Sequence, residues 1–135
     1  MMNVKEALQD FLEANKAILT GSGSETLSIY RDAFPTDKTA VGIVLLQMGR
    51  IPLKDIRKIE DVTFDFIVYA PKGEDTFLIC NNLNILLDEL HNINLNDDVN
   101  CMWADRNSGP DSWIGAFDLI DYQKITYDFR LRDIS

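Results

Sequence analysis

The sequence predicts an α+β fold with a mainly antiparallel sheet and two amphipathic helices packed on one face of that sheet. Two segments repeat apolar residues at helical spacing, and several others alternate apolar and polar residues with the period of a half-buried strand. The strand segments come in groups rather than in strict alternation with helices, which favours α+β over a parallel arrangement. At 135 residues the chain has the length of one domain, and we expect residues 1–135 to form it.

The first helix is predicted close to the N-terminus. Its apolar residues recur at helical spacing: Val4, Leu8, Phe11 and Leu12. Asn3 is the expected N-cap, and Glu6 three residues later completes a pattern that resembles a capping box. The helical pattern fades over residues 15–19, and residues 21–24 form an expected flexible connection.

A β-hairpin is predicted next. Leu27 and Ile29 alternate with polar neighbours, and residues 34–38 supply turn chemistry. Residues 40–48 form a nearly continuous apolar run, which is typical of a strand covered on both faces. Gly49 is expected to end this strand.

Residues 50–61 are predicted to form a long, partly structured loop. The segment carries a local basic cluster of Arg50, Lys54, Arg57 and Lys58, with apolar residues between the charges at a spacing compatible with one or two helical turns. Such a loop would complement an acidic surface, for example that of a neighbouring copy of the chain. The alternative is a solvated charged loop.

A strand with one buried face is predicted over residues 62–69, and residues 71–73 break it. The second helix follows at residues 74–90 with an apolar stripe on one side. Residues 92–98 form an expected polar loop.

The last third of the chain is predicted to be β-structure. Residues 99–105 and 113–118 form two expected strands, joined by a turn at residues 106–111. The final strand alternates clearly, with one face on the core and the other on water or a partner. Its core residues are Ile125, Tyr127, Phe129 and Leu131, and Arg130 and Arg132 lie on the other face.

Trp113 follows a Gly-Pro turn, where its side chain is either part of the core or exposed at a strand edge. Tryptophan is enriched among the residues that dominate protein interfaces. The candidate interface residues are therefore Arg50, Lys54, Arg57, Lys58, Trp113, Arg130 and Arg132.

The composition argues against nucleic-acid binding and membrane insertion. With 13 basic and 22 acidic residues the formal net charge is −9, and such a surface would repel DNA or would only confer solubility. No apolar run reaches the roughly 18 residues that a membrane-spanning helix needs. The N-terminus lacks the apolar region of a signal peptide, so we expect the protein to stay in the compartment where it is made.

No pattern in the sequence points to catalysis, a metal or a cofactor, and we expect a protein that is not an enzyme. His91 follows the second helix without a nucleophile motif beside it, and Cys80 and Cys101 are expected to be reduced core thiols. A Cys–His pair stays open but has no supporting pattern. Alternating Asn and Asp residues at 92–98 imitate a calcium loop, yet the required Gly and Glu positions are Asp97 and Trp103.

Several segments together resemble a known family in their order. They are the N-terminal helix, the Phe34–Val44 hairpin, the Thr63–Val68 strand, the helix ending Asn84–Leu90, Trp113-Ile114-Gly115, and Ile125–Leu131. In this order they resemble the tail-terminator, or minor capsid, proteins of long-tailed bacteriophages and prophages. The resemblance covers most of the chain and rests on element order and loose pattern rather than on a diagnostic motif.

The resemblance implies a virion protein that closes the tail tube at the head–tail junction and joins tail to head. Family members assemble as a hexameric ring, so the implied partners are other copies of the chain, the tail tube protein and the head-completion or connector protein. The implied location is the virion, and the bacterial host cytoplasm during assembly. Acidic residues lining the ring would let DNA slide, and residues 50–61, longer than the family pattern requires, would contact an adjacent subunit or the tube.

Two other classes remain open. One is a small cytosolic α+β adaptor or immunity-type protein that binds one partner as a monomer or dimer. The other is a hydrolase or ligand-binding domain that uses His91 or a cysteine.

Overall fold

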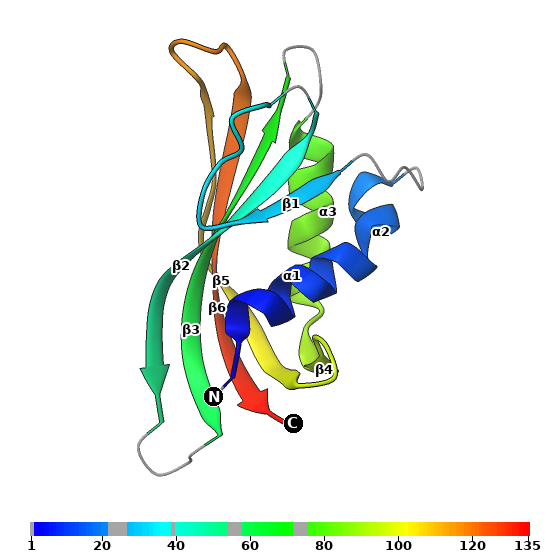
Figure 1. The fold of residues 1–135 in the computed structure, drawn as a ribbon, viewed down its shortest axis with the longest axis vertical. Helices are drawn as coiled ribbons and strands as arrows, with labels where there is room; N and C mark the ends of the chain where they lie inside the picture. The colour runs from blue at the N-terminus through cyan, green and yellow to red at the C-terminus, as the bar shows by residue number, and fades with distance from the viewer. Residues whose placement is uncertain (1, 22–26, 39, 54–57, 72–75) are drawn as a thin grey trace.

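The computed structural model describes residues 2–21, 27–38, 40–53, 58–71 and 76–135. The helices in these residues are α1 (Val4–Ala14), α2 (Lys16–Thr20) and α3 (Thr76–Asp88). The strands are β1 (Ser28–Arg31), β2 (Gly42–Pro52), β3 (Ile59–Ala70), β4 (His91–Asn94), β5 (Val99–Ile114) and β6 (Asp121–Asp133). They form a six-stranded sheet in the order β1-β2-β3-β6-β5-β4, with the helices beside it (Figure 1). The predicted α+β class is confirmed.

Helix α1 begins where the capping pattern predicts. The Asn3 side chain accepts a hydrogen bond from the Glu6 backbone N–H at 3.1 Å, and its own amide donates to the Glu6 carboxylate at 3.0 Å. The first bond is the one that a capping box makes, whereas the second joins the two side chains instead of using the Asn3 backbone N–H. The predicted apolar stripe of α1 is buried. The residues after α1, where the helical pattern of the sequence fades, still form the short helix α2.

Strands β1 and β2 do not form the predicted hairpin, because they are parallel neighbours with Ser28 paired to Gly42 and Arg31 to Leu45. Parallel neighbours need a connection that carries the chain back to the same end of the sheet. Phe34 in this connection packs against Tyr69 and Tyr122, with ring centroids 6.0 and 5.9 Å away. The turn-forming residues therefore lie within a longer crossover, rather than at a tight reversal.

Among the described residues of the segment 50–61, residues 50–52 and 59–61 are the ends of two paired strands, which corrects the predicted loop there. Strand β2 continues past Gly49 to Pro52, and β3 begins at Ile59. The register shifts between Gln47 and Gly49, which leaves one extra residue on β2. An extra residue reverses the alternation of side chains beyond it, so a bulge disguises the rest of a strand. The sequence-based helical turns over residues 54–57 lie outside the described residues.

Strand β5 is a single 16-residue strand, although the sequence predicts two strands and a turn. Its register against β6 shifts between Arg106 and Ser108 and again between Ser108 and Asp111, so bulges absorb the turn-forming residues. The strand ends at Ile114 rather than continuing to residue 118, and residues 115–120 lead into β6. The predicted polar loop after α3 instead begins with the short strand β4.

The predictions with the strongest periodicity are confirmed. Strand β3 includes all of residues 62–69, helix α3 lies within the predicted range 74–90, and β6 buries its predicted apolar face. The predicted strand at 40–48, expected to be covered on both faces, is confirmed only in part: residues 42–45 are buried, whereas Ala40 and Met48 are exposed.

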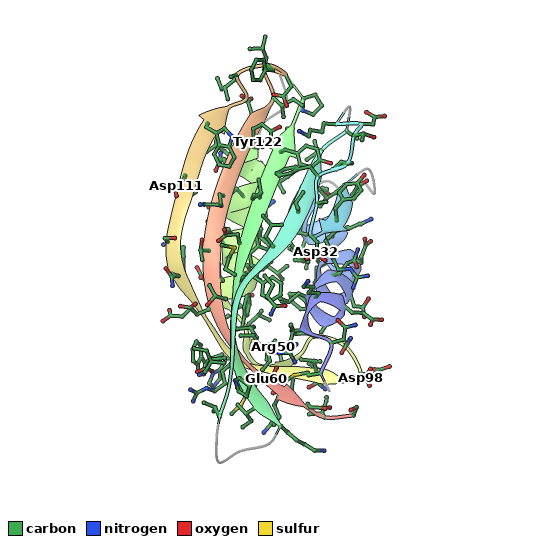
Figure 2. The ribbon with its side chains drawn as sticks, turned by 60° about the vertical axis from the view of Figure 1, so that its left-hand side comes forward. Asp32, Arg50, Glu60, Asp98, Asp111 and Tyr122 are labelled. Carbon is green, nitrogen blue, oxygen red and sulfur yellow. The ribbon has the colours of Figure 1, made fainter. Side chains whose placement is uncertain are left out.

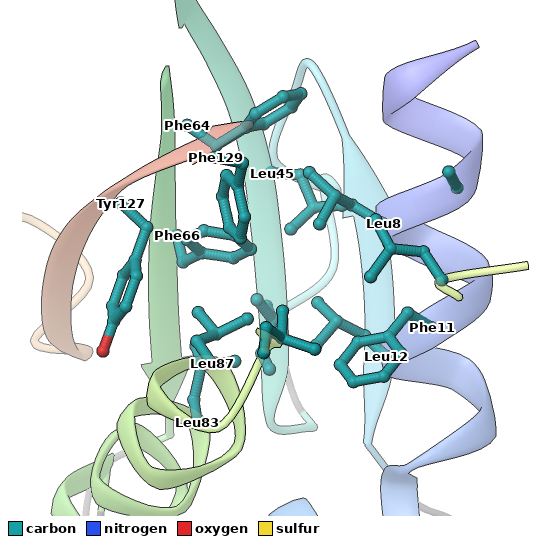
Figure 3. Close-up of a cluster of buried hydrophobic side chains, with 14 of the residues drawn as sticks. Leu8, Phe11, Leu12, Leu45, Phe64, Phe66, Leu83, Leu87, Tyr127 and Phe129 are labelled. Carbon is teal, nitrogen blue, oxygen red and sulfur yellow. The ribbon is translucent and has the colours of Figure 1, made fainter. Parts of the chain in front are cut away.

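The main core cluster joins apolar side chains of α1 and α3 to those of the central strands (Figure 3). At its centre are four fully buried rings in mutual contact, those of Phe64, Phe66, Tyr127 and Phe129. A second, smaller cluster contains Val44, Ile67, Tyr69 and Tyr122. Because Val44 belongs to it while Ile43 and Leu45 belong to the main cluster, the two clusters lie on opposite faces of the sheet.

Candidate protein-interaction surface

One end of the sheet is formed by the paired ends of β2 and β3, which we call the arm (residues 48–53 and 58–61). Arg50 in the arm is occupied within the chain, because its guanidinium lies 2.6 Å from the Glu60 carboxylate and donates to the Met2 carbonyl oxygen at 3.0 Å. Figure 2 shows Arg50 beside Glu60. Arg50 thus ties the N-terminal residues to the arm. Its contact with another subunit stays a prediction, and replacing it would disturb the fold.

The arm also carries exposed side chains. Lys58 is exposed, whereas the predicted site residues Lys54 and Arg57 lie outside the described residues. Met48 is 61% exposed and Ile51 is 67% exposed. Sequence analysis missed these two apolar residues, since their exposure depends on the bulge in β2. The arm therefore combines exposed apolar surface with a basic residue.

Arg130 lies on the face of the sheet opposite the main core. Its guanidinium donates to both carboxylate oxygens of Asp61, at 2.8 and 3.0 Å, and lies 5.5 Å from the ring centre of Trp103. Hydrogen bonding from Arg130 lowers the pKa of Asp61 below its ordinary value. Arg132 next to it donates to Asn100 at 3.2 Å. Both predicted arginines are thus held by neighbouring strands at the arm end of the sheet.

The Asp61–Arg130 pair predicts a pH-dependent effect of Asp61→Asn. Because the folded-state pKa is lowered, the pair stabilises the fold above the ordinary carboxylate pKa of about 4, and this contribution is lost as the pH falls through the folded-state pKa. Both side chains are 34% exposed, so we expect a loss below about 1 kcal/mol at pH 7. Urea unfolding of both proteins at pH 7 and pH 3 measures it. A difference that stays constant or grows at pH 3 would contradict this assignment.

Trp113 lies at the other end of the sheet and is part core, part surface. Its ring stacks on Tyr122 of β6, with centroids 5.1 Å apart and planes 5° from parallel. The side chain nevertheless remains 41% exposed. One ring face therefore belongs to the second cluster through Tyr122, and the rest is available to a partner.

Trp113 is one of several exposed apolar residues at this end, which we call the tip (residues 113–120). Phe117 is fully exposed, at 103% of its reference value, and Ile114 and Leu119 are 65% and 53% exposed. Sequence analysis assigned residues 113–118 to a strand and so missed this group. The sequence signal that could have indicated this group was the high density of apolar residues after the Gly-Pro pair. An exposed apolar patch on a protein surface marks an interaction site more often than a single exposed residue does.

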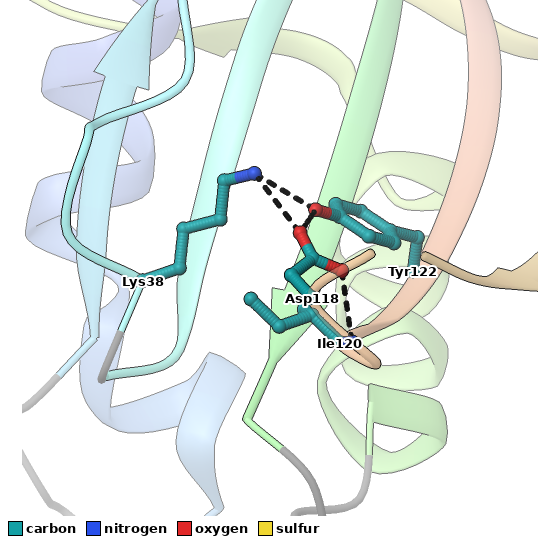
Figure 4. Close-up of polar contacts among 4 residues, drawn as sticks. All are labelled: Lys38, Asp118, Ile120 and Tyr122. Atoms are coloured by element: carbon teal, nitrogen blue, oxygen red, sulfur yellow. Dashed lines mark hydrogen bonds and ion pairs between the residues drawn. The ribbon is translucent and has the colours of Figure 1, made fainter. Parts of the chain in front are cut away.

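A polar network holds the tip in position, although the tip exposes apolar side chains (Figure 4). The Asp118 carboxylate accepts hydrogen bonds from the Ile120 backbone N–H at 3.0 Å and from the Tyr122 hydroxyl at 2.8 Å. Lys38 from the β1–β2 connection donates to the Tyr122 hydroxyl at 2.9 Å and lies 3.5 Å from Asp118. The backbone hydrogen bond from Ile120 and these contacts lower the pKa of Asp118. These contacts connect the tip to β6 and to the β1–β2 connection.

Between the two ends, the face opposite the main core is polar. Thr63 donates to Asp128 and Thr126 donates to Asp65, each at 2.6 Å across the β3–β6 pair. Asp105 of β5 lies directly opposite Asp128 in the sheet register. Two carboxylates at directly opposite positions repel each other. Three aspartates thus lie near the middle of this face, with Lys124 and Arg130 of β6 on the same face at either side of them.

The residues considered for catalysis are dispersed. His91 is exposed on β4, where it pairs with Trp103 in the register. Cys80 and Cys101 are free and buried, as expected, and burial raises their pKa to about 11 and about 12. Both are therefore neutral thiols at pH 7. Among the described residues, no group of three or more His, Cys, Asp or Glu side chains is placed to hold a metal ion.

A comparison with protein-family models found no match, and a search of curated proteins found no significantly similar sequence. Within the part of the chain that the structure describes, none of the helices has the length and apolar character needed to cross a bilayer. The described residues thus expose large apolar side chains at both the arm and the tip.

Proposed function

We propose that this chain is a bacteriophage or prophage virion protein that terminates the tail tube by ring assembly and joins tail to head. Its partners in this proposal are further copies of itself in a hexameric ring, the tail tube protein and the head-completion or connector protein. It acts without a cofactor, without catalysis and without sequence-specific binding of nucleic acid. The same proposal includes a tail-terminator-like packing of the two amphipathic helices α1 and α3 on one face of the sheet.

The observation that carries the proposal is the pair of exposed apolar ends. Ile51 on the arm and Phe117 on the tip are 67% and 103% exposed, on a chain that buries a complete core. Leaving large apolar side chains in water forgoes about 1.5–3 kcal/mol for each one. Assembly with other subunits would recover that free energy, which supports a ring-forming role over a purely solitary one.

Three aspartates on the face opposite the main core support the DNA-related part of the proposal. Asp65, Asp105 and Asp128 lie on strands β3, β5 and β6, and the register places Asp105 opposite Asp128. Clustered carboxylates repel the phosphate backbone at low and moderate salt. Facing the lumen of a ring, it would prevent DNA from adhering as it passes.

The proposal predicts self-association, measured as molar mass by light scattering over a protein concentration series, with and without magnesium. We expect the mass to rise with concentration toward a hexamer. The matched experiment adds purified tail tubes and images their ends by electron microscopy, since a ring can require the tube as template. A strict monomer that also leaves tube ends bare would refute the proposal and favour the adaptor or immunity-type alternative.

A further inference from the structure

We propose that the β1–β2 connection (residues 32–38) and the tip form a two-part lid over the second apolar cluster, and that the two parts open together. Tyr122 of β6 is the side chain on which both parts close. This inference concerns the single chain and does not depend on the proposed function.

Tyr122 is contacted from both segments. From the connection, the Phe34 ring centroid lies 5.9 Å from that of Tyr122, and the Lys38 ammonium donates to the Tyr122 hydroxyl at 2.9 Å. From the tip, the Trp113 ring stacks on Tyr122 with centroids 5.1 Å apart, and Asp118 accepts a hydrogen bond from the same hydroxyl at 2.8 Å. Figure 4 shows Lys38 and Asp118 both directed at this hydroxyl. The two segments thus share one anchoring side chain.

The second cluster lies on the face of the sheet opposite the main core. The buried apolar side chains of α1 and α3 all belong to the main cluster. Tyr69 and Tyr122 in the second cluster are nevertheless only 1% and 7% exposed. Phe34 of the connection lies against both rings, and Ile120 of the tip packs against the same cluster. The connection and the tip therefore give this cluster the cover that the helices give the main core.

Most of the lid itself is exposed to water. In the connection Pro35 and Lys38 are partly buried, in the tip Gly115 and Ile120 are partly buried, and the other residues of both segments are exposed. Segments with few buried contacts open locally at a much lower free energy than the core does. Because both segments pack on Tyr122, opening of one removes packing from the other. This shared contact is the reason to expect joint opening.

Opening would change the surface at this end of the sheet. The rings of Tyr69 and Tyr122 would be uncovered beside the exposed apolar side chains of the tip. A binding partner that contacts these rings can do so only in the open state, and it would increase the population of that state. The lid thus controls how much apolar surface this end of the sheet presents.

Amide hydrogen exchange of the Lys38→Met variant tests the lid. One reporter lies in each part: the Leu119 N–H donates to the Gly115 carbonyl at 3.1 Å, and the Asp32 N–H donates to the Leu45 carbonyl at 2.9 Å. We expect both amides to exchange roughly two- to five-fold faster than in the wild type, and by the same factor, because one opening event exposes both.

Lys16→Met is the matched control. The Lys16 side chain is 23% exposed, as is that of Lys38, and it pairs with Glu13 at 2.8 Å, far from the lid. It should leave both reporter amides unchanged. Faster exchange in Lys38→Met at only one of the two reporters would show that the segments open separately and would overturn the proposal. Equal acceleration of the Phe129 amide, in the centre of the sheet, would also overturn it, because the change would then be global unfolding.

Asp118→Asn gives the second measurement, from the tip side. Asparagine keeps an oxygen that can accept the Ile120 N–H but lacks the charge that pairs with Lys38. The Asp32 amide, in the other part of the lid, should again exchange faster, since coupling between two sites is reciprocal. In the double variant with Lys38→Met, the acceleration should be smaller than the product of the two single effects. Acceleration equal to that product would mean that the two residues act independently, contrary to the proposal.

Discussion

Phe66→Ala is expected to lower the free energy of unfolding by about 3–5 kcal/mol, as large-to-small changes of buried aromatic residues do. Phe66 is fully buried, and its ring contacts those of Phe64, Tyr127 and Phe129 at centroid distances of 6.4, 6.3 and 6.0 Å. Removing it leaves a cavity among rings that belong to two central strands. Urea unfolding followed by circular dichroism measures the change, at low protein concentration because association raises apparent stability.

Phe117→Ala is the matched control, because it removes the same side chain from a fully exposed position. We expect its free energy of unfolding to remain within about 0.5 kcal/mol of the wild-type value. Equal losses in the two variants would show that Phe66 is not packed as described, or that Phe117 is buried within the monomer.

Gly109→Ala is expected to destabilise the fold by about 2–4 kcal/mol, from backbone strain and overpacking together. Gly109 has a φ of 95°, a conformation that side chains with a Cβ rarely adopt. A Cβ at this position would lie 2.6 Å from the Lys124 carbonyl oxygen and 3.0 Å from the Ile125 Cα. Because both atoms belong to the backbone of the neighbouring strand, they cannot move aside without separating β5 from β6.

Gly49→Ala provides the control, since it is also a strand glycine beside a bulge. The nearest atom to its Cβ would be the Thr63 Cβ at 3.9 Å, an ordinary contact. We expect little loss of stability there. Thermal unfolding of the two variants in parallel measures the difference, and a Gly109→Ala protein as stable as Gly49→Ala would contradict the close approach of β5 to β6.

The sequence alone determines the elements whose side-chain periodicity is regular. Strand β6 alternates without interruption from Ile125 to Leu131, and the structure buries that face. Helix α1 has both its apolar stripe and its Asn3 cap in the sequence, because capping involves residues only three positions apart. Where the local signal and the final environment agree, no knowledge of distant residues is needed.

Tertiary structure decides the features that depend on a second segment. The extra residue near Met48 is visible only against β3, so the periodicity of β2 is interrupted before Gly49 although the strand continues to Pro52. The connection between the parallel strands β1 and β2 packs through Phe34 against Tyr69 and Tyr122, which lie far away in the sequence. Local turn propensity indicates a reversal there, and packing of the connection on the sheet overrides it.

The same division applies to the candidate surface. Sequence composition alone identifies the basic residues of the arm and singles out Trp113, whose interface role remains a prediction. Only the structure shows that Arg50 is occupied by Glu60 and Met2, and that Phe117 projects into solvent. Lys38 and Asp118 meet across 80 positions of sequence, and their contact connects the tip to the β1–β2 connection. The sequence gives the chemical type of each side chain. Its solvent exposure and its hydrogen-bond or ion-pair partners depend on residues that only the fold brings close, so the candidate surface could be identified only from the tertiary structure.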